Sequence, residues 1–381
     1  MQRFSPFALS AALHAYIGVR LVPALAAWPL AAFALIALLV ASALVIPAGW
    51  LYRRRVHRFS AALTWVSYIA MGLFSSLFVM TVLRDALLLA ASIVLWFMPG
   101  SLSWRALVDW TAVTVPVLAI LVTLVGVWNA RRTASVVDID VPIAGLPDAL
   151  RGFTIAQISD IHVGPTIKGG YVRNIVERVN RLGADMIAVT GDLVDGSVPD
   201  LRRHVAPLSE LSSRHGTFFV TGNHEYYSGA GAWIRELRGL GMKVLLNEHV
   251  VLDHGSSALV VAGVTDPSAH HFDPAQRSSP ERAIAGAPAR APVRVLLAHQ
   301  PRSASAAADA GFQLQLSGHT HGGQFWPWNL FVRMQQPFVA GLDRLRGLWI
   351  YTSRGTGYWG PPIRFGAPSE ITRLRLVAAD S

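Results

Sequence analysis

Cysteine is absent from this chain of 381 residues, and only 15% of its residues are charged. The lack of thiols excludes disulfide bonds and thiolate metal ligands, but it leaves the redox compartment open. Carboxylates are also scarce, since 23 Asp and Glu stand against 33 Lys and Arg. Any metal site in this chain must therefore be built from imidazole, amide and a few carboxylate groups.

Long stretches without a charged side chain fill the first third of the sequence. Pro23 to Tyr52, Phe59 to Leu83 and Trp110 to Ala130 each reach the roughly 20 apolar residues that a membrane-spanning helix needs. Phe4 to Val19 is a shorter candidate, for which a cleaved signal peptide is an alternative that the later spans make unnecessary. Ala86 to Met98 is shorter still and could cross, tilt or re-enter the membrane. We expect four spans, or five if this last segment crosses.

The excess of positive charge belongs mainly to this apolar part. Residues 1–134 contain ten Arg and no Lys against two Asp, which accounts for +8 of the net charge of +10. The run from Arg53 to Arg58 is the most basic, and such runs between spans favour the cytoplasmic side. The other residues carry only +2, so the expected partner is the lipid bilayer and no nucleic acid is expected. We therefore divide the chain into a transmembrane helical region, residues 1–134, and a second domain, residues 135–381.

Polar motifs follow apolar, β-prone runs at five places in the second domain. They are Asp160-Ile161-His162, Gly191-Asp192, Gly222-Asn223-His224-Glu225, His299 and Gly318-His319-Thr320-His321. The carboxyl ends of strands in an open α/β sheet share one edge, so these side chains are expected to meet there. Imidazole and carboxylate groups suit Zn, Mn and Fe. The pattern predicts a dinuclear metal site, and Asp192, directly after a strand, is the best candidate for a bridging carboxylate.

Helical spacing of apolar residues separates these motifs. It occurs at Val172 to Leu182, Leu201 to Leu211 and Trp233 to Leu240. The alternation of such stretches with strands predicts an α/β fold. The number of strands alone does not separate a single doubly wound sheet from two sheets packed together.

The five motifs together resemble those of the calcineurin-like metallophosphoesterase family, which read D-x-H, G-D-x-x-D, G-N-H-D/E, H and G-H-x-H. They occur here in the same order, as Asp160/His162, Asp192/Asp195, Asn223/His224/Glu225, His299 and His319/His321. The longer run Gly318 to Gln324 is similar to the branch of membrane-anchored or exported phosphodiesterases in this family. The resemblance implies a two-sheet β-sandwich flanked by helices, here preceded by an all-α transmembrane bundle.

Residue roles follow from the resemblance by position. It implies that Asp160, His162 and His321 hold one divalent metal ion. It implies that Asn223, His299 and His319 hold another, with Asp192 bridging the two. His224 would be a catalytic residue that binds no metal and protonates the leaving oxygen or stabilises the transition state, while a metal-bound hydroxide attacks phosphorus. Manganese, zinc and iron remain open as the two ions. We expect Asp195 to support the loop around Asp192, and Glu225 to lie behind the ligands or at the start of a helix.

Two other classes of function compete with this phosphoesterase. One is a membrane transporter or sensor whose soluble domain is regulatory, although the few ionisable residues near the spans lie at their expected ends. The other is a metal-binding scaffold without catalysis, against which the intact His224 argues.

The sequence also predicts the class of substrate and the side of the membrane on which the second domain lies. The aromatic run Gln324 to Phe331 predicts either core packing or an apolar lip facing the bilayer, with Arg333, Arg354 and Arg364 as donors to anionic head groups. We expect a lipid-linked or envelope phosphodiester, although preference between monoesters and diesters stays open. If Ala86 to Met98 crosses the cell membrane, the domain lies on its outer face, which the family branch favours. The oligomeric state stays open.

Overall fold

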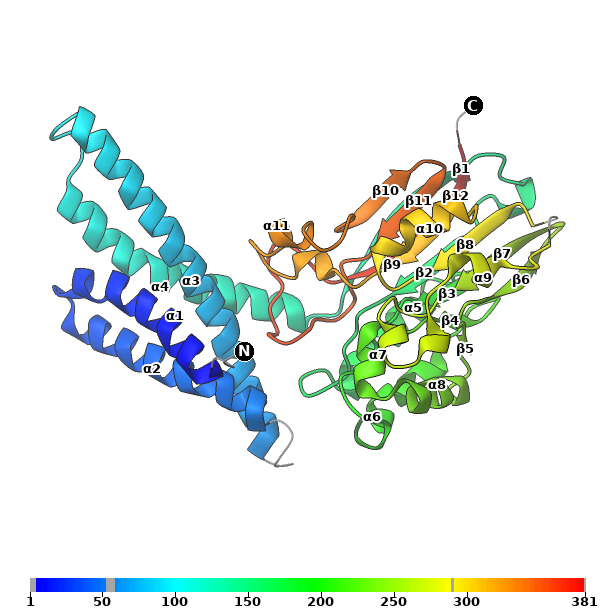
Figure 1. Ribbon diagram of the computed structural model, residues 1–381, viewed down its shortest axis with the longest axis horizontal. Coiled ribbons are helices and arrows are strands. Elements are labelled where there is room, and N and C mark those ends of the chain that lie inside the picture. Colours follow the sequence, from blue (N-terminus) through cyan, green and yellow to red (C-terminus); the bar gives the residue numbers. More distant parts are fainter. Residues whose placement is uncertain (1–4, 53–58, 289–290, 380–381) are drawn as a thin grey trace. The chain divides into compact units, whose positions relative to one another are not determined.

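The computed structural model describes residues 5–52, 59–288 and 291–379 (Figure 1). It divides into two compact units, each treated by itself below. The helical unit comprises Met1–Trp128 together with Gly360–Ile363, and the α/β unit comprises Asn129–Trp359 and Arg364–Ser381. The basic run Arg53 to Arg58, expected to be cytoplasmic, lies outside the described residues.

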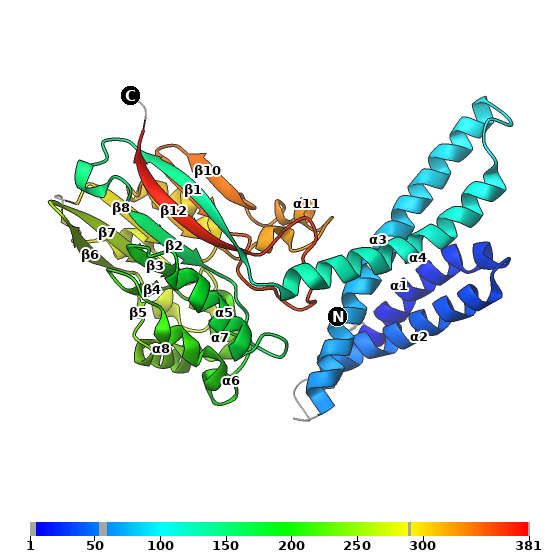
Figure 2. The same cartoon turned by 180° about the vertical axis from the view of Figure 1, so that it is seen from behind.

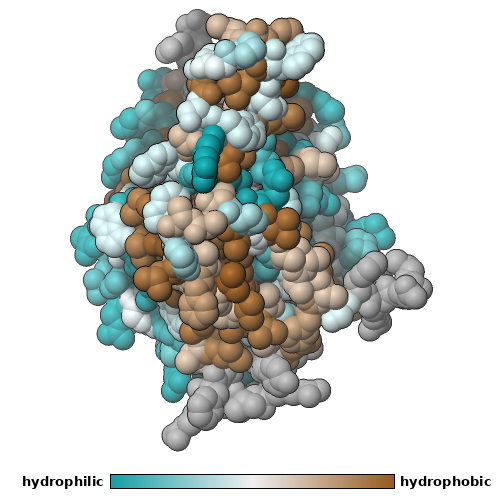
Figure 3. All heavy atoms as spheres, turned by 90° about the vertical axis from the view of Figure 1, so that its left-hand side faces the viewer, coloured by the Kyte–Doolittle hydropathy of each residue, from teal (hydrophilic) through white to brown (hydrophobic). Residues whose placement is uncertain are grey.

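Four α-helices form the helical unit. They are α1 (Pro6–Leu21), α2 (Pro29–Tyr52), α3 (Phe59–Phe97) and α4 (Trp104–Arg131), and the 3₁₀ turn η1 (Pro23–Leu25) follows α1. Small and aliphatic side chains such as Ile17, Leu39, Leu77 and Ala112 pack between the helices. Many apolar side chains point outward instead, and brown, apolar atoms gather over a broad central area of the face in Figure 3. A bundle that is apolar both inside and outside is typical of helices in a lipid bilayer.

Two expectations about the spans need correction. Ala86 to Met98 does not form a separate segment, because α3 continues through it without a break for 39 residues. Among the described residues, three helices are long and apolar enough to cross a membrane: Pro29–Gly49, Ala61–Phe97 and Trp104–Arg131. The helix α1 has 16 residues, fewer than the roughly 20 that a full span requires.

Two six-stranded sheets build the α/β unit (Figures 1 and 2). The first has the order β1 (Ser135–Ile143), β12 (Glu370–Ala378), β2 (Thr154–Ile158), β3 (Met186–Val189), β4 (Thr217–Phe219) and β5 (Lys243–Val244). The second has the order β10 (Gly341–Leu345), β11 (Leu348–Thr352), β9 (Leu314–Ser317), β8 (Val293–Leu297), β7 (Ser257–Gly263) and β6 (Glu248–His254). Strands β2 to β5 are parallel, as are β7, β8, β9 and β11, while β12 runs antiparallel to β2. Both sheets are therefore mixed.

The two sheets face each other across a shared apolar core. Ile155 and Phe218 of the first sheet belong to the same buried cluster as Leu259, Val295 and Leu314 of the second. Helices α5 (Gly169–Asn180), α6 (Val198–Val205) and α8 (Ala230–Gly239) bury the outer face of the first sheet. Helices α9 (Pro280–Ile284) and α10 (Ala304–Asp309) bury that of the second. This architecture confirms the two-sheet sandwich and excludes a single doubly wound sheet.

The predicted motifs all begin where strands end. Asp160 follows β2, Asp192 follows β3, and Asn223 begins the short helix α7 (Asn223–Ser228) after β4. In the second sheet, His299 follows β8, and His319 and His321 follow β9. Because β2 to β4 and β8 to β9 are parallel within their sheets, these ends gather at one edge of the sandwich.

Candidate metal centre

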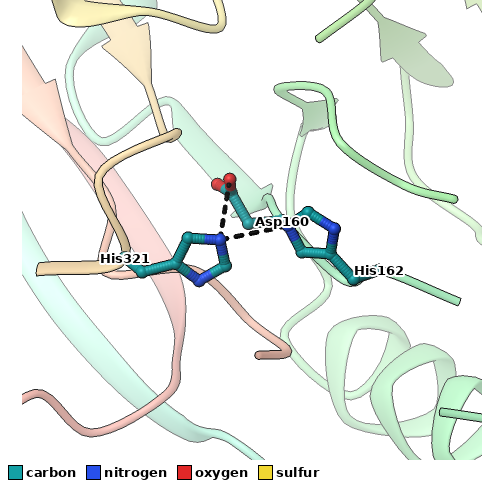
Figure 4. Close-up of side chains that lie close together, drawn as sticks. All are labelled: Asp160, His162 and His321. Atoms are coloured by element: carbon teal, nitrogen blue, oxygen red, sulfur yellow. Dashed lines mark hydrogen bonds and ion pairs between the residues drawn. The ribbon is translucent and has the colours of Figure 1, made fainter. Parts of the chain in front are cut away.

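One group of donor atoms lies on the segments that follow β2 and β9. His321 Nε2 lies 3.0 Å from His162 Nε2 and 3.5 Å from Asp160 Oδ1 (Figure 4). All three side chains are buried or nearly so, and their donor atoms converge within the distance that a single metal ion spans. The structure thus brings together Asp160, His162 and His321, as the motif spacing predicts.

A second group forms beside the first. His299 Nε2 lies 3.2 Å from Asp192 Oδ2 and 3.2 Å from His319 Nδ1. The side-chain oxygen of Asn223 is buried and has no hydrogen-bond partner. A buried amide oxygen without a partner is costly unless a cation or donor completes it, so Asn223 fits a ligand position.

Asp192 lies between the two groups. Its Oδ2 atom is 3.9 Å from His162 Nε2 and 3.2 Å from His299 Nε2. Its other oxygen, Oδ1, accepts a hydrogen bond of 2.8 Å from the backbone N–H of His224. The carboxylate is therefore held in one orientation, with Oδ2 turned to both groups.

Hydrogen bonds from outside the two groups fix which histidine nitrogens face inward. His162 Nδ1 lies 3.1 Å from Asp195 Oδ1, and His299 Nδ1 lies 2.7 Å from the backbone oxygen of Thr190. Both acceptors require a proton on Nδ1, so Nε2 is the nitrogen turned to the site in both rings. This pattern of a carboxylate or carbonyl behind the imidazole is common in protein metal sites.

The loops that carry these donors adopt an unusual backbone conformation. Five of the seven predicted ligands have positive φ angles: Asp160 (54°), His162 (56°), Asp192 (51°), His319 (71°) and His321 (51°). A left-handed conformation at a residue other than glycine costs about 1–3 kcal/mol and is concentrated at functional sites. The sandwich holds these five residues in place and so orients their side chains before any ligand binds.

Two glycines allow the loops to approach the donors closely. A Cβ atom on Gly222 would lie 2.2 Å from Asp192 Oδ1, and one on Gly318 would lie 2.1 Å from Asp160 Oδ2. Either contact would displace a carboxylate that faces the site. Gly222 and Gly318 are therefore required, because a side chain at either position would clash with a carboxylate of the site.

Burial and close charges shift the pKa values of the donors in both directions. Burial, together with the charge of His299, lowers the pKa of His319 to about 3. Burial and the neighbouring Arg364 likewise lower the pKa of His321. Asp192 is buried, which alone would raise its pKa, but His299 outweighs this effect and holds the pKa well below its usual range. Burial alone would lower the pKa of His299, but the charge of Asp192 outweighs burial and raises it well above its usual range, and burial raises the pKa of Asp160. A cation bound here would therefore displace protons from the site.

His224 differs from the other histidines in its partner. Its Nδ1 atom lies 2.5 Å from Asp195 Oδ1, and its Nε2 atom lies 4.0 Å from Asp192 Oδ2. Burial lowers the pKa of His224, but the hydrogen bond to Asp195 and the charges of Asp192 and Asp195 prevail and raise it to about 9. A histidine that keeps its proton at neutral pH is suited to donate it. By distance alone, His224 could also be a metal ligand, because its donor atom lies close to those of His162 and Asp192.

Asp195 and Glu225 hold the surroundings of the site. Asp195 contacts both His162 and His224, a more specific position than the loop support expected from sequence. Glu225 is buried and accepts hydrogen bonds from the backbone N–H groups of Asp192, Leu193 and Gly222. It caps the start of α7, which confirms its assignment as a helix-start carboxylate.

Two further residues have structural roles that the sequence did not reveal. Arg364, expected to meet anionic head groups, is fully buried and donates to the backbone oxygens of His321, Arg354 and Gly357. That expectation is wrong, because the guanidinium of Arg364 already donates its hydrogen bonds to these buried carbonyls. Gln324 pairs its side-chain amide with both backbone groups of Trp359, with two contacts of 2.9 Å. Only the position of Gln324 directly after the last motif could have drawn attention to it.

Known proteins share this domain. The family description "Calcineurin-like phosphoesterase" matches residues 153–323. A protein of Danio rerio named "Transmembrane protein with metallophosphoesterase domain" is 36% identical over 275 residues, which make up 69% of this chain and 63% of the relative. A protein of Bos taurus with the same name is 39% identical over 280 residues, with the same coverage of 69% and 63%. This chain thus spans 63% of the length of each of these two relatives.

A bacterial relative is covered more fully. An uncharacterized metallophosphoesterase of Campylobacter jejuni is 36% identical over 262 residues, which make up 68% of each chain.

Proposed function

This chain belongs to the calcineurin-like phosphoesterase family, and from this premise we propose that it is a membrane-bound, metal-dependent hydrolase of phosphoesters. Residues 135–381 form the catalytic domain in this proposal, and residues 1–134 form its membrane anchor. The observation that carries the proposal is the pair of adjoining donor groups that share the Oδ2 atom of Asp192.

Two divalent ions are the cofactors in this proposal. Asp160, His162 and His321 would hold one, and Asn223, His299 and His319 would hold the other, with Asp192 shared. Manganese, zinc and iron all accept this set of imidazole, carboxylate and amide ligands. When bound, such ions would neutralise the charge of the phosphoryl oxygens and make water a stronger acid.

His224 supplies the proton for the leaving group. Its Nδ1 atom is held by Asp195, so Nε2 is the nitrogen turned to the site. The oxygen of water bonds to phosphorus while the P–O bond to the alcohol breaks, with its electron pair staying on the alcohol oxygen. The proton on Nε2 passes to that oxygen, and a proton released by the attacking water restores His224. General acid catalysis of this kind contributes about 10²–10⁴ in rate.

A lipid-linked phosphodiester is the substrate that the surface near the site favours. Directly after the last ligand, Trp326 and Trp328 are 44% and 41% exposed, and Leu330 and Phe331 are more than half exposed. We term these four residues the aromatic lip. Their exposure contradicts the expectation of core packing and agrees with the expectation of an apolar lip. Exposed Trp rings beside apolar side chains suit the boundary between lipid and water.

The alternative of a transporter or sensor finds little support in the helical unit. Arg84 is only 5% exposed there, but its guanidinium donates to the backbone oxygens of Arg20 and Val108 and to the hydroxyl of Thr111. Asp85 accepts hydrogen bonds from Tyr16 and Arg20. These charges tie α1, α3 and α4 together, and their partners are fixed groups of the bundle.

The course of α3 and α4 supports a proposal for the side of the membrane on which the domain lies. The outer-face expectation depended on a separate crossing by Ala86 to Met98, which instead continues α3. Within the helical unit, α3 and α4 run in opposite directions, so α4 ends on the side where α3 begins (Figures 1 and 2). In the sequence, α3 comes directly after the basic run Arg53 to Arg58, and Arg131-Arg132 lie at the end of α4. By the positive-inside rule, we place the catalytic domain on the inner face of the cell membrane.

Reporter fusions test this placement. A fluorescent protein or alkaline phosphatase joined after Ser381 should give fluorescence and no phosphatase activity. The reverse result would move the domain to the outer face.

Turnover by the purified full chain tests the proposed activity. In detergent, the protein should hydrolyse phosphodiesters after addition of Mn, Zn or Fe, and a chelator should abolish the reaction until metal is restored. A protein that binds metal but hydrolyses neither monoesters, diesters nor lipid-linked diesters would be a binding scaffold, and the proposal would fail.

A further inference from the structure

Two exposed aromatic rings flank His224. Tyr227 lies three residues after His224 on α7, and this spacing places both on one face of the helix. The ring centroids of His224 and Tyr227 are 5.3 Å apart, and those of His224 and Trp359 are 5.6 Å apart. Tyr227 is 64% exposed and Trp359 is 53% exposed, so both rings offer uncovered apolar surface beside the proton donor.

Trp359 is held in this position by its backbone. The amide of Gln324 donates to the oxygen of Trp359 and accepts from its N–H group, both at 2.9 Å. This pairing imitates one rung of a β-ladder, and Gln324 is itself buried. The loop that carries Trp359 therefore presents the ring to His224 without burying it.

Phe272 extends the aromatic surface on the other side. Its ring centroid lies 5.9 Å from that of Tyr227 and 5.6 Å from that of Tyr226, and Phe272 is 53% exposed. Beyond it is an open hollow of about 350 Å³, lined mainly by apolar groups including Tyr226, Phe272 and Ala230. Tyr227 and Phe272 thus form a row of ring contacts between His224 and this hollow.

We propose that Tyr227, Phe272 and Trp359 form a subsite that binds the leaving group, and that this group begins with a hydrocarbon ring or chain. The inference depends on the proposed function, in which His224 protonates the leaving oxygen. The atoms attached to that oxygen must then lie next to His224, where Tyr227 and Trp359 stand, and Phe272 continues this surface beyond Tyr227. Aromatic faces favour flat or apolar groups over anionic, strongly hydrated ones.

Binding of two non-hydrolysable phosphonates tests the subsite independently of turnover. Phenylphosphonate and methylphosphonate share the anionic head and differ in the apolar group. Isothermal titration of the full-length, metal-loaded protein should show phenylphosphonate binding about 3- to 10-fold more tightly. Tyr227→Ala and Phe272→Ala should each remove most of this preference. Met334→Ala, which truncates an exposed apolar side chain outside the subsite and the aromatic lip, should keep it.

Turnover gives a second measurement. Methyl para-nitrophenyl phosphate and methyl trifluoroethyl phosphate have the same retained group and different leaving groups. Phe272→Ala and Trp359→Ala should lower kcat/KM for the aryl diester about 3- to 10-fold and leave the trifluoroethyl diester within about twofold. Because Tyr227 and Trp359 both lie against His224, the ratio between the two substrates is the informative quantity for Tyr227→Ala and Trp359→Ala, and Phe272→Ala gives the direct comparison.

The outcomes separate the subsite from the proposed function. Equal binding of the two phosphonates by the unmodified protein, binding of neither, or equal losses on both diesters, would overturn the subsite. A preference for phenylphosphonate that depends on Tyr227 and Phe272, without hydrolysis of any diester, would support the subsite and count against the proposed function alone.

Discussion

Asp195 accepts a hydrogen bond of 2.5 Å from His224, and the same carboxylate oxygen lies 3.1 Å from Nδ1 of His162. One carboxylate therefore connects a predicted metal ligand with the predicted acid. Asp195 is itself buried, which alone would raise its pKa, but the two histidines lower it below the usual range. An ionised Asp195 in turn favours the protonated form of His224.

Replacing Asp195 with Asn should shift the pH profile of the reaction. Activity that requires protonated His224 falls as the pH rises through the pKa of that group, which is about 9 with Asp195 present. Without the carboxylate, that pKa moves toward the ordinary value of about 6.5, so activity should be lost at lower pH. Profiles of kcat/KM for Asp195→Asn and the exposed control Asp148→Asn would measure the shift. Superimposable profiles for Asp195→Asn and the unmodified protein would contradict the coupling.

Asp192→Asn should cost both metal and activity. A neutral amide cannot balance two cations as the shared carboxylate does, so we expect a loss of at least about 100-fold in metal affinity and no measurable turnover. Elemental analysis and a hydrolysis assay on the same preparation would test this. Full metal content with normal activity would show that Asp192 is not the bridge.

His224 and His319 should separate chemistry from metal binding. His224→Gln should retain its metal and lose about 10²–10⁴ in rate, because only the proton donor is removed. His319→Ala should lose metal as well as rate, since its imidazole belongs to the second donor group. Equal metal depletion in both variants would make His224 a ligand, a position that its distance from Asp192 permits.

The aromatic lip should matter only for long-chain substrates. Trp326→Ala and Trp328→Ala should impair hydrolysis of a lipid-linked diester in detergent micelles several-fold more than hydrolysis of a soluble aryl diester, because the rings contact lipid rather than the phosphoryl group. Equal losses on both substrates, or none on either, would remove the lip from substrate binding.

Local sequence located the candidate donors along the fold, because each of them follows a strand. Apolar, β-prone runs before Asp160, Asp192 and His299 correctly marked β2, β3 and β8, and parallel pairing brought their ends together. The division into two sheets was not readable from these runs, since it depends on the pairing of β12 with β1 and β2, which are more than 200 residues away. Such long-range pairing leaves no periodic signal.

The helical region was predicted less accurately, because charges were taken as ends of spans. Arg84 and Asp85 do not end α3, since hydrogen bonds within the bundle satisfy both side chains. The helix ends only before Pro99-Gly100, where proline and a positive φ angle at Gly100 stop it. Arg364 was misjudged for a related reason, as its backbone partners lie in loops whose courses the sequence does not specify.

The left-handed backbone at Asp160, His162, Asp192, His319 and His321 affects how any substitution there should be interpreted. Alanine removes the donor group and keeps the Cβ atom, so it retains the backbone strain that His and Asp already bear, whereas glycine removes the donor and relieves that strain as well. A glycine scan of this site would therefore mix two effects, and an alanine scan would not. The metal content of His319→Ala would report the loss of the ligand, and the difference in thermal stability between His319→Gly and His319→Ala would report the relieved strain less the entropy that glycine adds to the unfolded chain.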